Sequence, residues 1–123
     1  MASSPRILIV DSDEDHKRIC GIILQRSGFE VFTMEPGHDF IQQVEHFIPQ
    51  LIFLEPHFFD QEGMEVIRLL RGHPIHQYIP VVYFTSDDNI SMLAREAGAD
   101  GYLGKPFDID NMLKIVRKFI PDR

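Results

Sequence analysis

The sequence contains a single cysteine, Cys20, so the chain has no intramolecular disulfide and no cage of thiolate ligands around a metal. This usage is typical of a reducing compartment, and we expect a cytoplasmic protein. Basic runs are also lacking, since 12 lysines and arginines stand against 19 aspartates and glutamates for a net charge of -7. Without a string of cations to neutralise phosphates, direct binding to nucleic acid is not expected.

Long apolar runs are lacking as well. The longest run near the N-terminus covers residues 7–10, far short of a signal-peptide core or of the roughly 20 residues that span a bilayer. We therefore expect neither export by that route nor membrane insertion. The 123 residues are 44% apolar and 25% charged, which predicts one domain over residues 1–123 with a core that needs no disulfide.

Five short apolar segments predict β-strands over residues 7–10, 29–32, 51–54, 81–84 and 101–103. The first, third and fourth are apolar at every position, which is typical of strands covered on both faces in a parallel sheet. Helices are predicted over residues 13–27, 38–47 and 62–71, from the polar cluster 86–89 to Gly98, and from Asp108 onward. The residues expected to face the core in the first and third helices are Ile19, Ile22, Ile23, Leu24, Val66, Ile67, Leu69 and Leu70.

Strands that alternate with helices through short turns predict a doubly wound α/β fold with right-handed crossovers. Ligands of such a sheet bind outside the carboxyl ends of the strands. Those positions hold Asp11, Ser12 and Asp13 after the first strand, Glu55 after the third, Thr85 after the fourth and Lys105 after the fifth. Carboxylates, a hydroxyl and an ammonium gathered at one sheet edge suit a divalent cation and a phosphoryl group.

Residues 6–15, 27–31, 51–54, 79–86 and above all 96–108 (Glu-Ala-Gly-Ala-Asp-Gly-Tyr-Leu-Gly-Lys-Pro-Phe-Asp) resemble the receiver domain of bacterial two-component response regulators. The resemblance implies a flavodoxin-like (βα)5 fold with strand order 2-1-3-4-5. It also implies phosphoryl transfer from a histidine kinase to an aspartate after the third strand, with Mg²⁺ held by an acidic pair after the first. Thr85, Lys105 and Tyr102 match the family's phosphate-contact and switch residues.

Two positions depart from the family's pattern. Glu55 stands where the phosphoacceptor aspartate is expected, and Ser12 replaces the second member of the acidic pair that begins with Asp11. Mg²⁺ demands near-octahedral oxygen ligands. With Asp11 and Glu55 as its remaining carboxylates, the metal site is expected to be weak or absent. Asp13 is one residue too far along and is expected to cap the first helix.

The longer Glu55 side chain is expected to reach toward Thr85 and Lys105 and to accept bonds from them unmodified. An attraction between Glu55 and Lys105 would amount to about 4 kcal/mol at roughly 4 Å and an effective dielectric near 20, before desolvation. Such contacts would close the pocket without metal, either as a mimic of the active state or as a plug. The resulting hypothesis is a pseudo-receiver that is not an enzyme and acts as a phosphorylation-independent protein-interaction module.

Protein partners are expected on the face that the resemblance assigns to output, formed by the fourth helix, fifth strand and fifth helix. This face includes Ile90, Met92, Tyr102 and Lys114, and its partner would be a histidine kinase or an output protein. In the loop after the third strand, one of Phe58 and Phe59 is expected to pack inward, and a partner contact is the other possibility. The chain ends soon after its last predicted helix, which leaves open a single-domain protein or one separated from an output module.

Two alternatives remain open at this point. A phosphodonor could still modify another carboxylate such as Asp11 or Asp60. A small phosphatase similar to the haloacid dehalogenase superfamily would use Asp11 as nucleophile and Asp13 as general acid and base, although the sequence has no cap insertion and no late acidic pair. His73 and His76 are expected to be solvated loop residues, because no third ligand of suitable spacing is near them.

Overall fold

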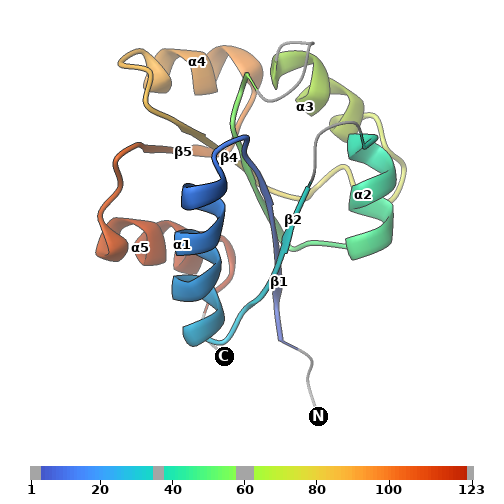
Figure 1. The fold of residues 1–123 in the computed structure, drawn as a ribbon. Helices are drawn as coiled ribbons and strands as arrows, with labels where there is room; N and C mark the ends of the chain where they lie inside the picture. The colour runs from blue at the N-terminus through green and yellow to red at the C-terminus, as the bar shows by residue number, and fades with distance from the viewer. Residues whose placement is uncertain (1–3, 35–37, 58–62, 122–123) are drawn as a thin grey trace.

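The computed structural model describes residues 4–34, 38–57 and 63–121. Within them, five strands and five helices alternate along the chain (Figure 1). In chain order the elements are β1 Arg6–Val10, α1 Glu14–Arg26, β2 Glu30–Thr33, α2 Phe40–Phe47, β3 Leu51–Leu54, α3 Gly63–Arg71, β4 Val81–Thr85, α4 Ile90–Ala97, β5 Gly101–Gly104 and α5 Ile109–Phe119. The predicted Phe58, Phe59 and Asp60 loop lies outside the described residues.

The strands form one parallel sheet in the order β2-β1-β3-β4-β5, which confirms the predicted fold class and topology. Helices lie on both sides of the sheet, as Figure 1 shows. Because every strand runs in the same direction, the residues that follow β1, β3, β4 and β5 arrive at a single edge. This arrangement brings the predicted site residues together from four separate parts of the sequence.

Two apolar cores flank the sheet, because successive side chains of a strand point to opposite faces. On one face, Leu8 and Val10 of β1 belong to a cluster completed by α2, α3 and α4. On the other face, Ile7 and Ile9 belong to a cluster completed by α1 and α5. Burial on both sides explains why residues 7–10 of β1, 51–54 of β3 and 81–84 of β4 are apolar without alternation.

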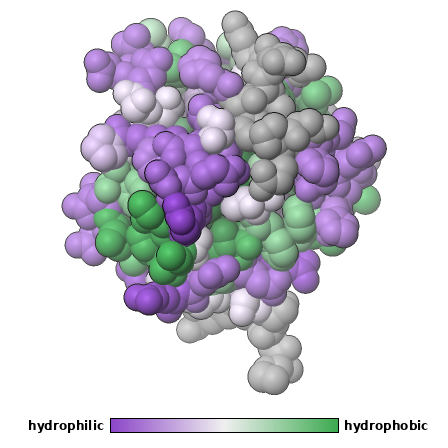
Figure 2. Space-filling view, viewed as in Figure 1, coloured by the Kyte–Doolittle hydropathy of each residue, from purple (hydrophilic) through white to green (hydrophobic). Residues whose placement is uncertain are grey.

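The apolar stripe predicted for α1 is partly wrong. Ile19 and Ile22 are 47% and 46% exposed, whereas Cys20 and Leu24 are buried against the sheet. Figure 2 shows apolar surface in this area, over α1 and the neighbouring α5. The prediction failed because this isoleucine-rich helix can turn apolar residues toward the sheet in several rotations about its axis. In the structure the helix is rotated so that Cys20 and Leu24 face the sheet. Leu69 of α3 was likewise predicted to be buried and is 57% exposed.

Aspartate side chains cap the N-termini of α1, α2 and α5. The Asp13 side chain accepts bonds from the N–H groups of Asp15 and His16, so its predicted role as the cap of α1 is confirmed. Gly28, with a φ of 97°, follows the last turn of that helix. At α4 the N-cap residue Asn89 makes no side-chain capping bond. Instead the Asp87 carboxylate accepts the Asn89 N–H one step outside the helix.

Candidate functional site

The candidate site lies at the carboxyl edge of the sheet and comprises Asp11, Ser12, Glu55, Thr85 and Lys105, which we call the carboxyl-edge site. Backbone hydrogen bonds hold its parts in place. The Glu55 N–H donates to the Val10 carbonyl at 2.8 Å, and the Lys105 N–H donates to the Thr85 carbonyl at 2.9 Å. The peptide bond between Lys105 and Pro106 is cis. The sheet register therefore fixes where each of these side chains starts.

Asp11 and Lys105 form a buried ion pair at the centre of the site. The Lys105 Nζ lies 2.7 Å from Asp11 Oδ2, and the two side chains are 9% and 0% exposed. The Asp11 Oδ1 atom accepts the N–H of Asp13 at 2.9 Å. On its other side the Lys105 ammonium lies 4.7 Å from the centre of the Phe84 ring, a cation–π arrangement. The Lys105 ammonium is thus held between a carboxylate and an aromatic face.

The surroundings of Asp11 keep its carboxyl group ionised. Burial by itself raises the pKa of Asp11, but the Lys105 side chain, which forms an ion pair with it, opposes this rise. The Asp13 N–H and the positive charge of Lys105 add to this effect, so the pKa of Asp11 lies below its ordinary value of 3.8. A buried charge of this kind is stable only while its partners remain in place.

Glu55 is hydrogen-bonded to Ser12, and this contact corrects the expectation that Glu55 accepts bonds from Thr85 and Lys105. Its Oε2 atom accepts the Ser12 N–H at 2.9 Å and the Ser12 hydroxyl at 2.8 Å. Lys105 is held by Asp11 instead. The physical reason is that Asp11 is buried without other charge compensation, whereas half-exposed Glu55 finds two donors on the neighbouring loop.

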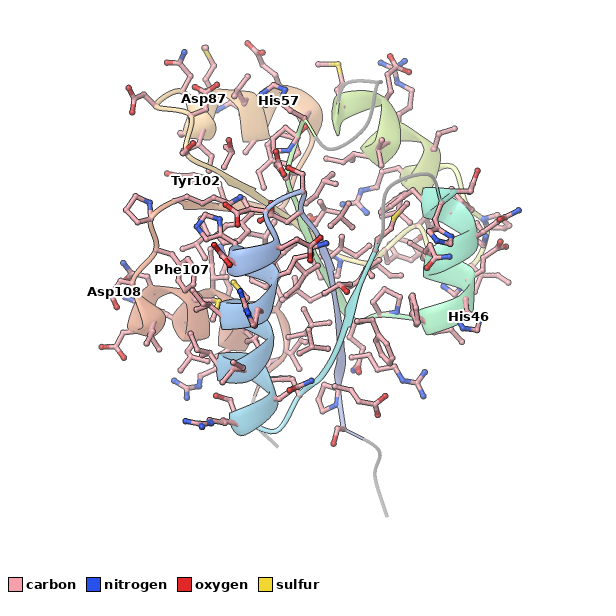
Figure 3. All side chains as sticks on the ribbon, viewed as in Figure 1. His46, His57, Asp87, Tyr102, Phe107 and Asp108 are labelled. Carbon is pink, nitrogen blue, oxygen red and sulfur yellow. The ribbon has the colours of Figure 1, made fainter. Side chains whose placement is uncertain are left out.

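Thr85 and Tyr102 occupy the remaining predicted positions. Thr85 ends β4 with 7% exposure, and its Oγ1 accepts the Asp87 N–H at 3.3 Å. Tyr102 belongs to the edge strand β5 and is 47% exposed. Figure 3 shows Tyr102 between α4 and α5, on the side of the sheet. The structure therefore brings Asp11, Ser12, Glu55, Thr85 and Lys105 to one edge and leaves Tyr102 on the neighbouring surface.

Cys20 lies close enough to the site to feel its charges. The thiol is 2% exposed. Burial first, and then the negative charge of Asp11, raise the pKa of Cys20 to about 12, while Lys105 opposes this rise. The thiol is therefore protonated and unreactive in the folded chain at neutral pH.

The histidines form no metal site in the part of the chain that the structure describes, where no group of three or more histidine, cysteine, aspartate or glutamate side chains is placed to hold an ion. The His73 Nδ1 atom accepts the N–H groups of Ile75 and His76, each at 3.1 Å. Its Nε2 atom faces Glu45 at 3.2 Å. His73 was predicted to be a solvated loop residue, but its side chain is only 12% exposed and organises the loop after α3.

Sequence reasoning missed two contacts of the site, the Ser12–Glu55 hydrogen bonds and the position of Phe84 under Lys105. The signal for the first was present in the sequence, because the serine after the first predicted strand is a hydrogen-bond donor and the glutamate after the third is an acceptor. The Glu55 side chain is long enough to reach both Ser12 donors. A carboxylate in place of the Ser12 hydroxyl would instead repel the Glu55 carboxylate. The signal for Phe84 was its position directly before Thr85 on a strand buried on both faces.

The chain belongs to the response regulator receiver domain family, whose sequence profile matches residues 7–117. It is 31% identical over 121 residues to the transcriptional regulatory protein GltR of Pseudomonas aeruginosa, a match that covers 97% of this chain and 50% of GltR. The chain spans about half or less of the length of the curated relatives it matches first, such as GltR and the PhoP protein of Bacillus subtilis. Receiver domains are modules of two-component signalling, so the predicted family is confirmed.

Solved structures share the fold of this chain. A putative response regulator from Chloroflexus aurantiacus is 25% identical, with a TM-score of 0.87 and coverage of 98% of this chain and 100% of that one. The receiver domain of the sensor histidine kinase PA1611 from Pseudomonas aeruginosa PAO1 has a TM-score of 0.84 at 19% identity, with coverage of 98% and 100%. That structure holds a magnesium ion coordinated in its active site cleft.

The residues of the carboxyl-edge site fit a magnesium ion poorly. Of the two carboxylates, Asp11 is engaged by Lys105 and the Asp13 N–H, and Glu55 is engaged by Ser12. The nearby Asp13 carboxylate caps α1 and contacts His16 Nδ1 at 3.3 Å. Mg²⁺ would have to displace these partners to gain its oxygen ligands.

Asp13 is equally unsuited to the phosphatase alternative, which required it as a general acid and base. Its Oδ1 atom accepts two backbone N–H groups at the start of α1. Membership of the receiver family replaces that alternative. No helix in the part of the chain that the structure describes is long and apolar enough to cross a membrane.

Proposed function

We propose that this receiver domain has lost ordinary phosphorylation at the position after β3 and transmits signals by binding protein partners. The observation that carries the proposal is the Glu55 carboxylate, whose Oε2 atom already accepts two hydrogen bonds from Ser12. By position Glu55 stands where the family carries its phosphoacceptor. The site is thus satisfied internally, with no enzymatic step required of it.

The ion pair between Asp11 and Lys105 supports the same proposal. Lys105, the residue that matches the family's phosphate-contacting lysine, is only 9% exposed at its side chain and is held 2.7 Å from Asp11. Its charge is therefore neutralised without a phosphoryl group. We propose that Thr85 and Lys105 keep the family's spatial arrangement here as fixed structural elements, and that Mg²⁺ binds more weakly than in receivers with a complete acidic pair.

Modification of another carboxylate is the second candidate. Asp11 is 0% exposed and paired with Lys105, so a phosphodonor would have to break a buried ion pair to reach it. Asp60, the other carboxylate considered, lies outside the described residues. The geometry supports this candidate less well than the first, and the test below would detect such a modification.

The partner face belongs to the proposal too. We place it on α4, β5 and α5, where Met92 and Tyr102 are 49% and 47% exposed and Lys114 is exposed, while Ile90 is half-buried against the core. Kinases and output proteins of two-component systems are the class of partner expected, and we propose a cytoplasmic location and a single receiver-like domain over residues 1–123.

Intact mass after incubation with acetyl phosphate and Mg²⁺ tests the proposal. We expect the native chain to keep its mass, while the double variant Ser12→Asp/Glu55→Asp gains one phosphoryl group and binds Mg²⁺ at least about tenfold more tightly by calorimetry. A native chain that gains the phosphoryl group would overturn the proposal, and peptide mapping would then identify the modified residue. A double variant that stays unmodified would show that this pocket is not built as in other receivers, which would also overturn it.

A further inference from the structure

A groove runs along the free edge of β5, between α4 and α5. Two adjoining hollows of about 400 Å³ and 590 Å³ lie on either side of Tyr102, and Tyr102, Ile115 and Lys118 line both. We call these two hollows together the β5 groove. Figure 1 shows β5 as the last strand of the sheet, with α4 and α5 on its two sides, and Figure 3 shows Tyr102 there.

The walls of the groove follow from helical spacing. The residues of α5 that line it are Asn111, Lys114, Ile115 and Lys118, which recur at the intervals that place side chains on one face of a helix. Met112 and Val116 occupy the opposite face and are buried in the core. The Tyr102 ring, Ile115 and the nearly buried Leu103 provide the apolar part of the surface.

The charge of the groove differs in sign from that of the chain. Arg95 of α4 and Lys114 and Lys118 of α5 line it, although the chain carries a net charge of -7. In the described residues none of these three side chains makes an ion pair, whereas Lys17, Arg18, Arg68, Arg71 and Lys105 all do. Arg95 and Lys118 line the smaller hollow, and Lys114 and Lys118 line the larger one. Lys118 also lies 5.4 Å from the centre of the Phe119 ring. Because none of the three has a carboxylate partner in the described residues, their charges are available to a partner.

The one carboxylate that lines the groove does not offset these cations. Asp100 borders the 400 Å³ hollow, but its Oδ2 atom accepts from the Arg71 guanidinium at 2.6 Å and from the Val81 N–H at 2.8 Å. Its charge is thus compensated from the side of α3. The residues that line the groove therefore carry a net positive charge, and this charge favours an anionic partner.

We propose that the β5 groove binds a short acidic segment of a partner protein, in which carboxylates flank one large apolar residue. The apolar side chain packs against Tyr102 and Ile115, where burial supplies most of the affinity. The flanking carboxylates pair with Lys114, Lys118 and Arg95 and select this segment over neutral ones. The inference rests on the proposed function as an interaction module and specifies the chemistry of its partner.

A nucleic acid is a poorer match for the same cations. Tight binding of that kind neutralises on the order of 6–10 phosphates, and the groove offers three cations in a chain of strongly negative charge. A second copy of this acidic chain is the remaining occupant to consider. Self-association of the chain is therefore one outcome of the test below. Light scattering would detect it as a molecular mass that rises with protein concentration.

Selection from a random peptide library displayed on phage tests the proposal, with the full chain immobilised. We expect enriched peptides to carry aspartates and glutamates on both sides of a leucine, methionine or aromatic residue. A synthetic peptide of the enriched sequence should lose at least about tenfold in affinity for the variant Lys114→Glu/Lys118→Glu. Its affinity should also fall as salt is raised. The neutral variant Lys114→Gln/Lys118→Gln should lose affinity to an intermediate degree.

The matched control is Arg26→Glu/Arg117→Glu, which makes the same change of net charge at two exposed positions that do not line the groove. It should bind the peptide like the native chain. Enriched peptides without acidic residues, equal losses in both charge-reversed variants, or self-association in place of peptide binding would each overturn the proposal. These results are independent of the mass measurement with acetyl phosphate, so failure of this inference and failure of the proposed function are distinguishable.

Discussion

Glu55 and Ser12 form a hydrogen-bonded pair across the carboxyl edge of the sheet. The Ser12 N–H and hydroxyl both donate to the Glu55 Oε2 atom, at 2.9 and 2.8 Å. Ser12 supplies both donors and Glu55 the acceptor, so the two side chains satisfy each other. A glutamate after β3 needs donors that a second acidic residue after β1 would not provide. The pair thus gives the Glu55 carboxylate hydrogen-bond partners within the chain.

A double-mutant cycle on Ser12→Ala and Glu55→Ala tests whether this pair stabilises the fold. Each single change should lower the free energy of unfolding by about 0.5–1.5 kcal/mol, because one partner of a hydrogen bond is lost. The double change should cost less than the sum, since both remove the same contact. Urea denaturation followed by circular dichroism measures all four proteins, and strictly additive losses would contradict the coupling.

The Asp11–Lys105 ion pair predicts a pH dependence of stability. The pKa of Asp11 is lowered below its ordinary value of 3.8. Its ionised form therefore contributes stability that is present above about pH 3.8 and is lost as the pH falls through the lower pKa of the folded chain. The variant Lys105→Met leaves the Asp11 charge buried without its partner, at a cost of about 3–5 kcal/mol at pH 7. This cost should shrink in acid, where protonation removes the unpaired charge.

Urea denaturation of both proteins from pH 7 down to pH 3 checks this expectation. The control is Lys114→Met, which removes an exposed lysine that makes no ion pair in the described residues. Its stability relative to the native chain should change little across the same range. A Lys105→Met deficit that stays constant with pH would show that Asp11 does not carry the effect.

The reactivity of Cys20 reports how often α1 separates from the sheet. Burial raises the pKa of Cys20 to about 12, so the thiol is protonated at pH 8, and the side chain is 2% exposed. We expect native protein to resist Ellman's reagent at pH 8 and to react fully in concentrated urea. Rapid reaction of the native chain would mean that α1 leaves the sheet far more often than the buried contacts of Cys20 and Leu24 suggest.

Gly63 and Gly21 are expected to respond oppositely to the same substitution. A Cβ atom at Gly63 would lie 2.6 Å from the Tyr83 hydroxyl and 3.1 Å from the Pro56 Cα, so Gly63→Ala should cost about 1–3 kcal/mol. A Cβ atom at Gly21 meets nothing within 4 Å inside α1. Gly21→Ala should therefore stabilise the chain by about 0.5–1 kcal/mol through its higher helix propensity. Thermal unfolding of the two variants measures both signs.

A second variant tests whether the Tyr83 hydroxyl causes the loss of stability in Gly63→Ala. Tyr83→Phe removes the hydroxyl that a Cβ atom would strike. The combination Gly63→Ala/Tyr83→Phe should therefore lose less stability than the sum of the single changes. A fully additive loss would place the clash at the two other close atoms, the Pro56 Cα at 3.1 Å and the Tyr83 Cζ at 3.2 Å, which Tyr83→Phe does not remove.

Much of this molecule was predictable from local patterns. Apolar strands without alternation, polar residues directly after them, and the cap at Asp13 each result from interactions within a few residues or from the parallel arrangement itself. These features led to the doubly wound α/β fold and to the set Asp11, Ser12, Glu55, Thr85 and Lys105 at one edge. The receiver family itself was predicted from the resemblance of longer segments, above all residues 96–108. The inward face of α1 was not predictable in the same way, because its isoleucines satisfy several helix orientations equally well.

The sequence by itself determined the fold class, the strand order implied by the family, and which chemical groups meet at the carboxyl edge. Only the tertiary structure decided how those groups pair: Lys105 with Asp11, and Glu55 with Ser12. Pairing at a crowded edge depends on which carboxylate is more deeply buried and which donors lie within reach, and both quantities exist only once four strands have been brought side by side.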